Sequence, residues 1–295
     1  RSGRGSGIWD PWHGCKKVSP GCQNCYMFHL DSQRGKDGAL IYKVQSSFDR
    51  PLKRNRRGDF VIPPGSTIRV CMTSDFFLEE ADEWRGEVWK MIEKRSDVLF
   101  YLLTKRIERV KDCLPENWGD GWENVWMNVS AENQKMADRR IPLLLDLPFK
   151  HRGIMAAPLI GEIDLRPHLY SGKIERVIVG GENYDGAREC HYEWVQRMHQ
   201  DCVDHHVNFE FIETGNHFVK NGRKYEILDK RKQQEQAKKS GLFYEGRAVS
   251  VHLTEVAQGE SVPLFRTNAV TLCDSCAYKK FCGTQSGRPS CMLSL

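Results

Sequence analysis

Residues 9–26 read WDPWHGCKKVSPGCQNCY. Three cysteines of this stretch, Cys15, Cys22 and Cys25, have the spacing C-x6-C-x2-C on a loop rich in Gly and Pro. Three thiolates this close together can ligate three irons of one [4Fe–4S] cube and leave the fourth iron open to a small molecule. The alternative is a zinc knuckle that lacks its fourth ligand, with His13 as a candidate for that place.

A second cysteine set lies near the end of the sequence with the spacing C-x2-C-x5-C-x8-C. It consists of Cys273, Cys276, Cys282 and Cys291. Four thiolates can complete the ligand set of a cube or of one tetrahedral zinc ion, so the spacing predicts a metal site without choosing the metal. The other four cysteines are scattered, and we expect them to be small buried hydrophobic residues. These are Cys71, Cys113, Cys190 and Cys202.

The length and composition argue against a disulfide framework, because 295 residues can bury a full core without covalent links. The sequence shows no signal-peptide pattern and no run of eighteen apolar residues. We therefore expect a cytoplasmic protein of a reducing compartment with no membrane partner. Residues 1–7, RSGRGSG, have the composition of a flexible leader or a cloning scar.

Strand and helix patterns alternate through the middle of the sequence. The strand pattern covers residues 8–12, 67–72, 98–103, 125–129, 153–157, 175–179 and 208–212. The helix pattern covers residues 79–94, 107–114, 132–147 and 194–207, with a break or a late start expected at Pro142. This alternation predicts parallel βα units over residues 8–215, arranged as an open or closed α/β barrel.

In such barrels the chemistry lies at the carboxyl ends of the strands. Because the cysteine triad follows the first predicted strand, it should lie at that end. From residue 216 the pattern changes to short polar segments and a charged helix over residues 229–239. We expect residues 216–295 to form a small cysteine-rich cap that carries the second metal site.

The opening motif resembles that of a phage and prophage family of unknown function whose members are described as radical-SAM-like. The resemblance is carried by residues 9–26 and continues through Ser74-Asp75-Phe76-Phe77, Leu103-Thr104-Lys105-Arg106, Asn128-Val129-Ser130-Ala131-Glu132-Asn133 and Val177-Ile178-Val179-Gly180-Gly181-Glu182. It implies a partial (βα)6-type radical SAM barrel. The C-terminal cysteines resemble a Twitch or SPASM auxiliary iron–sulfur segment with one cluster.

The resemblance implies an enzyme that uses S-adenosyl-L-methionine (SAM). The open iron would bind SAM, and one electron from a donor such as flavodoxin or ferredoxin would cleave it to methionine and a 5′-deoxyadenosyl radical. The implied cofactors are SAM, the SAM-binding [4Fe–4S] cluster and a second, auxiliary [4Fe–4S] cluster.

Several polar residues near the predicted strand ends are candidates for the site. The candidates for holding SAM are Tyr26, Thr73, Ser74, Asp75, Asn128, Ser130 and Glu182. Lys105 is a candidate for binding a SAM carboxylate or a substrate phosphate, and Glu213 for acid–base catalysis. Structural alternatives remain open: a core tyrosine at Tyr26, a helix cap at Ser130, a surface pair of Lys105 and Arg106, and a helix-end salt bridge at Glu213.

Basic residues gather in two runs that suggest a nucleic-acid substrate. Residues 50–57 hold five basic residues and no acid, and residues 221–240 hold seven basic and three acidic residues. We expect both runs near the carboxyl ends of the strands, where they would bind DNA or RNA so that a base, such as a modified thymidine, is altered. The alternatives are a radical SAM enzyme for a peptide or small metabolite, and an iron–sulfur or zinc nucleic-acid-binding protein without SAM cleavage.

Overall fold

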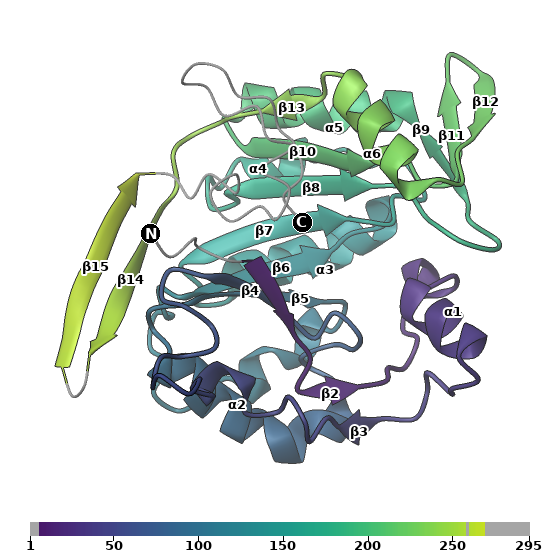
Figure 1. Ribbon diagram of the computed structural model, residues 1–295. Helices are drawn as coiled ribbons and strands as arrows, with labels where there is room; N and C mark the ends of the chain where they lie inside the picture. Colours follow the sequence, from purple (N-terminus) through teal and green to yellow (C-terminus); the bar gives the residue numbers. More distant parts are fainter. Residues whose placement is uncertain (1–5, 258–259, 269–295) are drawn as a thin grey trace.

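A largely parallel eight-stranded sheet forms the centre of the computed structural model, which describes residues 6–257 and 260–268 (Figure 1). Its strand order is β1-β4-β5-β6-β7-β8-β10-β13, and β13 alone runs antiparallel to its neighbour. The strands are β1 (Ser6–Trp9), β4 (Thr67–Val70), β5 (Leu99–Thr104), β6 (Val125–Ser130), β7 (His151–Ala156), β8 (Arg176–Gly180), β10 (Asn208–Glu213) and β13 (Phe243–Tyr244). The predicted α/β class and the parallel strands are thus confirmed.

The seven parallel strands follow one another across the sheet in chain order. Successive right-handed crossovers that always step to the next strand place their helices on one face, as in an α/β barrel. Among the described residues the sheet stays open, because β1 and β13 form its two edges. The sheet therefore has barrel-like connectivity without barrel closure.

The helices follow the predicted positions with two differences. The main helices are α2 (Asp82–Lys94), α3 (Gln134–Asp146) and α5 (Tyr192–Asp204). The helix expected over residues 107–114 is instead two short 3-10 turns, η4 (Ile107–Arg109) and η5 (Lys111–Cys113). The break expected at Pro142 is absent, since α3 continues through it, and the Asn133 side chain caps the start of α3 by accepting from Met136 N.

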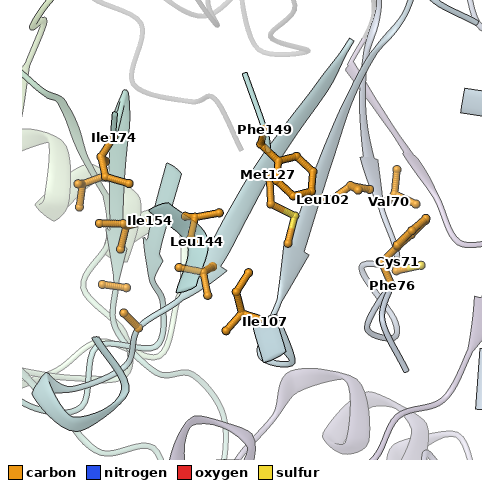
Figure 2. Close-up of a cluster of buried hydrophobic side chains, with 14 of the residues drawn as sticks. Val70, Cys71, Phe76, Leu102, Ile107, Met127, Leu144, Phe149, Ile154 and Ile174 are labelled. Atoms are coloured by element: carbon orange, nitrogen blue, oxygen red, sulfur yellow. The ribbon is translucent and has the colours of Figure 1, made fainter. Parts of the chain in front are cut away.

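The core lies between the sheet and these helices. Val70, Leu102 and Met127 from three strands pack in one buried cluster with Leu144 of α3. Figure 2 shows these side chains, with Phe149 and Ile154, forming one continuous apolar layer. Because side chains alternate along a strand, the residues between them point to the opposite face. We call that opposite face the inner face.

The inner face carries a separate and smaller cluster. Tyr101 of β5 stacks on Trp126 of β6, with ring centroids 5.2 Å apart, and Val251 of β14 (Ser250–Ala257) packs against both strands. β14 pairs with β15 (Glu260–Asn268). Strand alternation and register also place Arg69, Leu103 and Asn128 on the inner face.

The chain after residue 215 packs beside the central sheet and adds one strand, β13, to it. A hairpin of β11 (His217–Lys220) and β12 (Arg223–Glu226) is joined to β9 (Glu189–His191) in a small sheet. Helix α6 (Lys230–Lys239) then packs on β10, and β13 pairs with β10. The part of the cap predicted for residues 216–244 therefore extends the α/β core. No helix in the described residues is long and apolar enough to cross a membrane.

Candidate functional site

The cysteine loop, residues 10–25, connects β1 to α1 (Tyr26–Gln33). It passes through β2 (Trp12–His13), which pairs with β3 (Tyr42–Lys43), and through the 3-10 turn η1 (Pro20–Cys22). Cys15 follows β2, Cys22 ends η1, and Cys25 is the N-cap residue of α1. All three thiols therefore lie on one short segment that leaves the carboxyl end of β1.

Hydrogen bonds place this loop over the carboxyl edge of the sheet. Gly14 N donates to the Thr73 carbonyl at 3.2 Å, and Ser74 Oγ donates to the Gly14 carbonyl at 2.6 Å. Residues 73 and 74 lie three and four positions beyond the end of β4. In Figure 1 the chain passes from β1 through β2 to α1 on the side to which β7, β8 and β10 point. The position predicted for the triad at this edge is thus confirmed.

Arg106, just after β5, contacts the first cysteine. Its Nη1 lies 3.8 Å from Cys15 Sγ, and its Nη2 donates to the Lys16 carbonyl at 2.7 Å. Asp75 orients this guanidinium through a contact of 3.1 Å. The Asp75 carboxylate also accepts from Thr104 Oγ1 at 2.7 Å and from Lys105 N at 3.0 Å. Asp75 is one of the residues predicted to hold SAM. In the described residues its carboxylate is bonded to other residues of the protein, and through Arg106 it supports the cysteine loop.

Glu132, just after β6, holds the middle of the loop. Its Oε1 accepts from Gly21 N at 3.1 Å, and its Oε2 accepts from Arg140 Nη1 at 2.8 Å. A Cβ on residue 21 would lie 2.9 Å from Glu132 Cδ, so only glycine allows this approach without a shift. Burial raises the pKa of Glu132, but hydrogen bonds from Ser19 and Gly21 and the charge of Arg140 outweigh it and hold the pKa below its ordinary value.

Glu182, just after β8, holds the third part of the loop. Its Oε2 accepts from Asn24 Nδ2 at 3.0 Å and from Arg188 Nε at 2.8 Å. Arg188 Nη2 also donates to the Pro20 carbonyl at 2.9 Å. Burial raises the pKa of Glu182, but the bonds from Arg188 and Asn24 outweigh it and leave the pKa lowered. Glu182, predicted to hold SAM, therefore braces the segment between Cys22 and Cys25.

The two glycines before Glu182, Gly180 and Gly181, allow two backbone segments to lie close together. A Cβ on Gly181 would lie 2.1 Å from the Thr214 carbonyl oxygen, and Gly181 N donates to the Glu213 carbonyl at 2.9 Å. The Gly180-Gly181 pair thus lets the ends of β8 and β10 approach closely, which directs Glu182 toward the loop.

The other residues predicted to bind SAM lie around the same edge. Tyr26 hydroxyl donates to the Met72 carbonyl, and Thr73 N donates to Asp10 Oδ1 at 3.1 Å. Tyr26 is 40% exposed, so it is not the core tyrosine of the alternative interpretation. Ser74, through its bond to Gly14, also supports the loop.

Lys105, Ser130 and Asn128 lie on the inner face or at its carboxyl end. Lys105 Nζ donates to Ser130 Oγ at 3.1 Å, and Asn128 Nδ2 donates to the Leu102 carbonyl at 3.1 Å. Both Ser130 and Asn128 are buried, whereas Lys105 is half-buried. Ser130 does not cap α3, because Asn133 does.

Glu213 at the end of β10 is tied to neighbouring elements. Its Oε1 accepts from Asn183 Nδ2 at 2.8 Å, and its Oε2 lies 3.1 Å from Lys230 Nζ of α6. The structure thus contains the ion pair that was the alternative to catalysis at Glu213. Within the described residues this pair links α6 to the sheet, and the catalytic role of Glu213 stays a prediction.

The sequence suggests two metal groups for the three thiols, a zinc ion and an iron–sulfur cube. The described residues contain no group of three or more His, Cys, Asp or Glu side chains that could hold one metal ion. A single zinc ion requires ligands about 2.3 Å from the metal, whereas a cube places its three thiolates on separate irons. His13, the candidate fourth ligand for zinc, has its Nε2 on Asp31 Oδ2 at 2.6 Å.

The chemistry of the donor set fits an iron–sulfur cube. Three thiols share one loop, and a guanidinium stands beside Cys15 to offset negative charge. Burial raises the pKa of the Cys15 thiol to about 11, against an opposing effect of Arg106. Metal binding displaces such a proton, because the ligand is the thiolate.

The two basic runs lie at different places. Residues 50–57 are anchored by Arg95, which donates to the Pro51 carbonyl at 2.5 Å and to the Ile62 carbonyl at 2.7 Å. Arg95 lies just before β5, so residues 50–57 lie toward the amino ends of the strands. The prediction that this run lies near the carboxyl ends was therefore wrong. Residues 221–240 form the β11–β12 hairpin end and α6, beside the carboxyl end of β10.

The second cysteine set lies outside the described residues. Cys273, Cys276, Cys282 and Cys291 therefore stay predicted ligands, and so does the auxiliary cluster. No sequence pattern had indicated Glu132, Arg140 and Arg188 as supports of the cysteine loop. An acidic residue shortly after each apolar strand, as at Asp75, Glu132 and Glu182, was the available signal.

Fold and site together define an α/β protein that carries a three-cysteine loop on the carboxyl edge of a parallel sheet, held by carboxylates from three strand ends. The chain belongs to the family described as protein of unknown function (DUF5131), whose model matches residues 5–252. That range includes all eight strands of the central sheet and the cysteine loop. Comparisons with curated proteins and with solved structures give no match.

Proposed function

We propose that this protein is a radical SAM enzyme built on a partial barrel. Cys15, Cys22 and Cys25 would hold a [4Fe–4S] cluster, which would supply the electron that cleaves SAM to methionine and a 5′-deoxyadenosyl radical. The observation that carries the proposal is the three-thiol loop fixed over the carboxyl edge of consecutive parallel strands. That edge is where α/β barrels place their reacting groups.

The residues of the chain have positioning roles in this proposal. Asp75 acts through Arg106, Glu132 acts through Gly21, and Glu182 acts through Asn24. Each supports a different part of the loop, so the loop is held before any ligand binds. Lys105 is half-buried at the same edge and is available to bind a SAM carboxylate. A cube bound by three thiols has one open iron for the amino and carboxylate groups of SAM.

Anaerobic reconstitution followed by electron paramagnetic resonance tests this assignment. The reduced parent protein should show a [4Fe–4S]+ signal that changes when SAM is added. Cys22→Ala should lose the SAM-responsive signal, whereas Cys113→Ala, which removes a thiol outside both cysteine sets, should keep it. A SAM-responsive signal of full intensity in Cys22→Ala would reject the proposed ligand set.

A nucleic acid is the substrate class that we propose for this enzyme. A groove of about 830 Å³ lies between the β11–β12 hairpin and α6, and Lys220, Lys224 and Lys232 are among its lining residues. Tyr225 in the same groove is 40% exposed, so its ring can stack on a base. The hairpin pairs with β9, which follows Arg188, and Arg188 contacts the cysteine loop. The groove and the loop thus share one edge of the molecule.

Binding at two salt concentrations tests the substrate class. Phosphate contacts by several lysines should make binding of single-stranded DNA, duplex DNA or tRNA weaken steeply with salt. Reversing the charges of Lys224 and Lys232 to Glu should reduce both affinity and salt slope. The same reversal at Arg56 and Arg57, in the other basic run, should leave them unchanged. Absent or salt-insensitive binding of all three would favour a peptide or metabolite substrate.

A further inference from the structure

The groove between the β11–β12 hairpin and α6 has two walls of different chemistry. Phe218 and Tyr225 are register partners in the hairpin, so they lie on one face of it, and Lys220 lies two residues after Phe218 on the same face. On α6, Lys232 and Gln236 are four residues apart and so lie on one side of the helix. All five residues line the groove. One wall therefore carries rings and a cation, and the other carries a cation and an amide.

Part of the apolar surface in this groove is open to solvent. Tyr225 and Leu228 both line the groove and are exposed, Leu228 to 67%. Phe218 is buried and stacks on Phe211 of β10, with ring centroids 6.1 Å apart, so it joins the hairpin to the core. The Arg223 guanidinium lies over the Tyr225 ring, 5.4 Å from its centroid. Tyr225 is therefore a flat ring that a neighbouring cation supports and that a ligand in the groove can reach.

Two lysines of the groove have no acidic partner. In the part of the chain that the structure describes, no ion pair involves Lys220 or Lys232. The groove also contains the carboxylates of Glu226 and Asp229, and Asp229 caps α6 by accepting from Lys232 N at 2.9 Å. This mixture of charges does not suit a long run of phosphates, because the carboxylates repel them. It suits a ligand that has one or two phosphates and an uncharged, flat part.

The groove has the size of a site for a small ligand. Its volume is about 830 Å³, within the roughly 300 to 1,000 Å³ of such sites. We propose that it binds one unpaired nucleotide of the nucleic-acid substrate. The base stacks on Tyr225, its phosphate lies at Lys220 and Lys232, and the Gln236 amide forms a hydrogen bond with the base edge.

This assignment specifies the form of the nucleic acid. Bases in a duplex stack on one another, so their faces are free only in a single strand, a loop or a flipped nucleotide. The substrate is therefore single-stranded or opened where it meets the groove. The inference rests on the substrate class proposed above, and it concerns binding alone, so SAM cleavage is measured separately.

Three labelled oligonucleotides of equal length test this inference by fluorescence anisotropy at one salt concentration. They are a single strand, the same strand paired with its complement, and an abasic strand that keeps the phosphates and lacks the bases. The parent protein should bind the single strand at least tenfold more tightly than either of the other two. Reconstituted and iron-free protein should show the same preference, because the groove includes no residue of the cysteine loop.

Substitutions separate stacking from phosphate binding. Tyr225→Ala should lower the affinity for the single strand by about 5- to 100-fold and leave the affinity for the abasic strand unchanged, whereas Tyr225→Phe should match the parent. Lys232→Gln should weaken binding of both strands, because its phosphate contact does not depend on the base. Tyr170→Ala removes an exposed tyrosine outside the groove and should bind like the parent.

Thermal unfolding monitors folding, and if Tyr225→Ala does not fold, the comparison of the three oligonucleotides with the parent protein decides. The inference is overturned if the parent binds the duplex or the abasic strand as tightly as the single strand, or if Tyr225→Ala keeps the preference for bases. Absence of binding to all three overturns it together with the substrate class. Formation of 5′-deoxyadenosine by the same sample would then leave the radical SAM assignment intact.

Discussion

At the scale of single residues, the site depends on carboxylates that bind the cysteine loop. Asp75, Glu132 and Glu182 are each at most 5% exposed. Glu132 and Glu182 contact the loop directly, and Asp75 supports it through Arg106. Buried carboxylates are costly unless they are paired and hydrogen-bonded. Here every one of them accepts from a backbone N–H and from an arginine. Glu132 and Glu182 also accept from the loop itself, through Gly21 N and Asn24 Nδ2, so the loop supplies part of the contacts that offset this cost.

Removing one of these carboxylates should loosen the loop. Glu182→Gln should lower the free energy of unfolding by about 1 to 3 kcal/mol, because Arg188 loses a charged partner, and the iron bound after reconstitution should fall. Denaturant unfolding and iron analysis measure the two effects. Glu189→Gln is the matched control, because Glu189 pairs with Lys224 at the surface and its loss should change the free energy of unfolding little. Equal effects in both variants would contradict the bracing role.

The same carboxylates predict a pH dependence of stability. The pKa values of Glu132 and Glu182 are lowered in the folded protein from an ordinary value of 4.5. Both therefore contribute stability that is present above about pH 4.5 and is lost as the pH falls through their lowered folded values. Thermal unfolding of the iron-free protein from pH 6 to pH 3 should show this loss. In Glu132→Gln and Glu182→Gln the loss of stability at low pH should be smaller. The same loss in these variants as in the parent would show that the two carboxylates do not cause it.

At the scale of elements, the strands were predictable because each is an apolar run between polar turns. Residues 125–130 of β6 are all buried, as expected for a strand covered on both faces. The sequence predicts one helix where residues 107–113 form two 3-10 turns, because the apolar spacing of so short a segment fits both forms. The bracing contacts were not predictable, since they join Gly21 to Glu132 and Asn24 to Glu182 across more than a hundred residues.

Close contact between the loop and the β6 end gives an element-scale prediction. Gly21→Ala should displace the loop from Glu132 and lower the iron content after reconstitution, because the added methyl would approach to 2.9 Å. Gly86→Ala in α2 is the control, since its methyl meets no neighbour within 4 Å. That substitution should stabilise the protein by about 0.5 to 1 kcal/mol and leave the iron content unchanged. Normal iron content in Gly21→Ala would show that the approach is not needed.

At the scale of the whole molecule, the sequence predicted where the triad would lie, because a loop that follows the first parallel strand must lie at the carboxyl edge. It did not predict that residues 50–57 lie toward the opposite edge. Their position depends on Arg95, whose contacts with Pro51 and Ile62 no local pattern indicates.

The two cysteine sets predict the metal content of the whole chain. Two four-iron cubes would give about eight iron and eight sulfide per chain after anaerobic reconstitution. Replacing Cys273, Cys276, Cys282 and Cys291 together by Ala should leave about four of each. Elemental analysis measures both values. If the parent protein instead binds one zinc ion per chain and this variant binds none, the C-terminal cysteines form a zinc site and not an auxiliary cluster.

The central claim is that the cysteine loop makes this protein a radical SAM enzyme. The most direct measurement is the formation of 5′-deoxyadenosine from SAM under anaerobic reduction by dithionite, with the iron content of each sample known. The account predicts 5′-deoxyadenosine from the parent protein and from Cys113→Ala, and none above background from Cys22→Ala. A parent protein that holds a full [4Fe–4S] cluster and forms no 5′-deoxyadenosine, or a Cys22→Ala protein that forms it at the parent rate, would contradict the account.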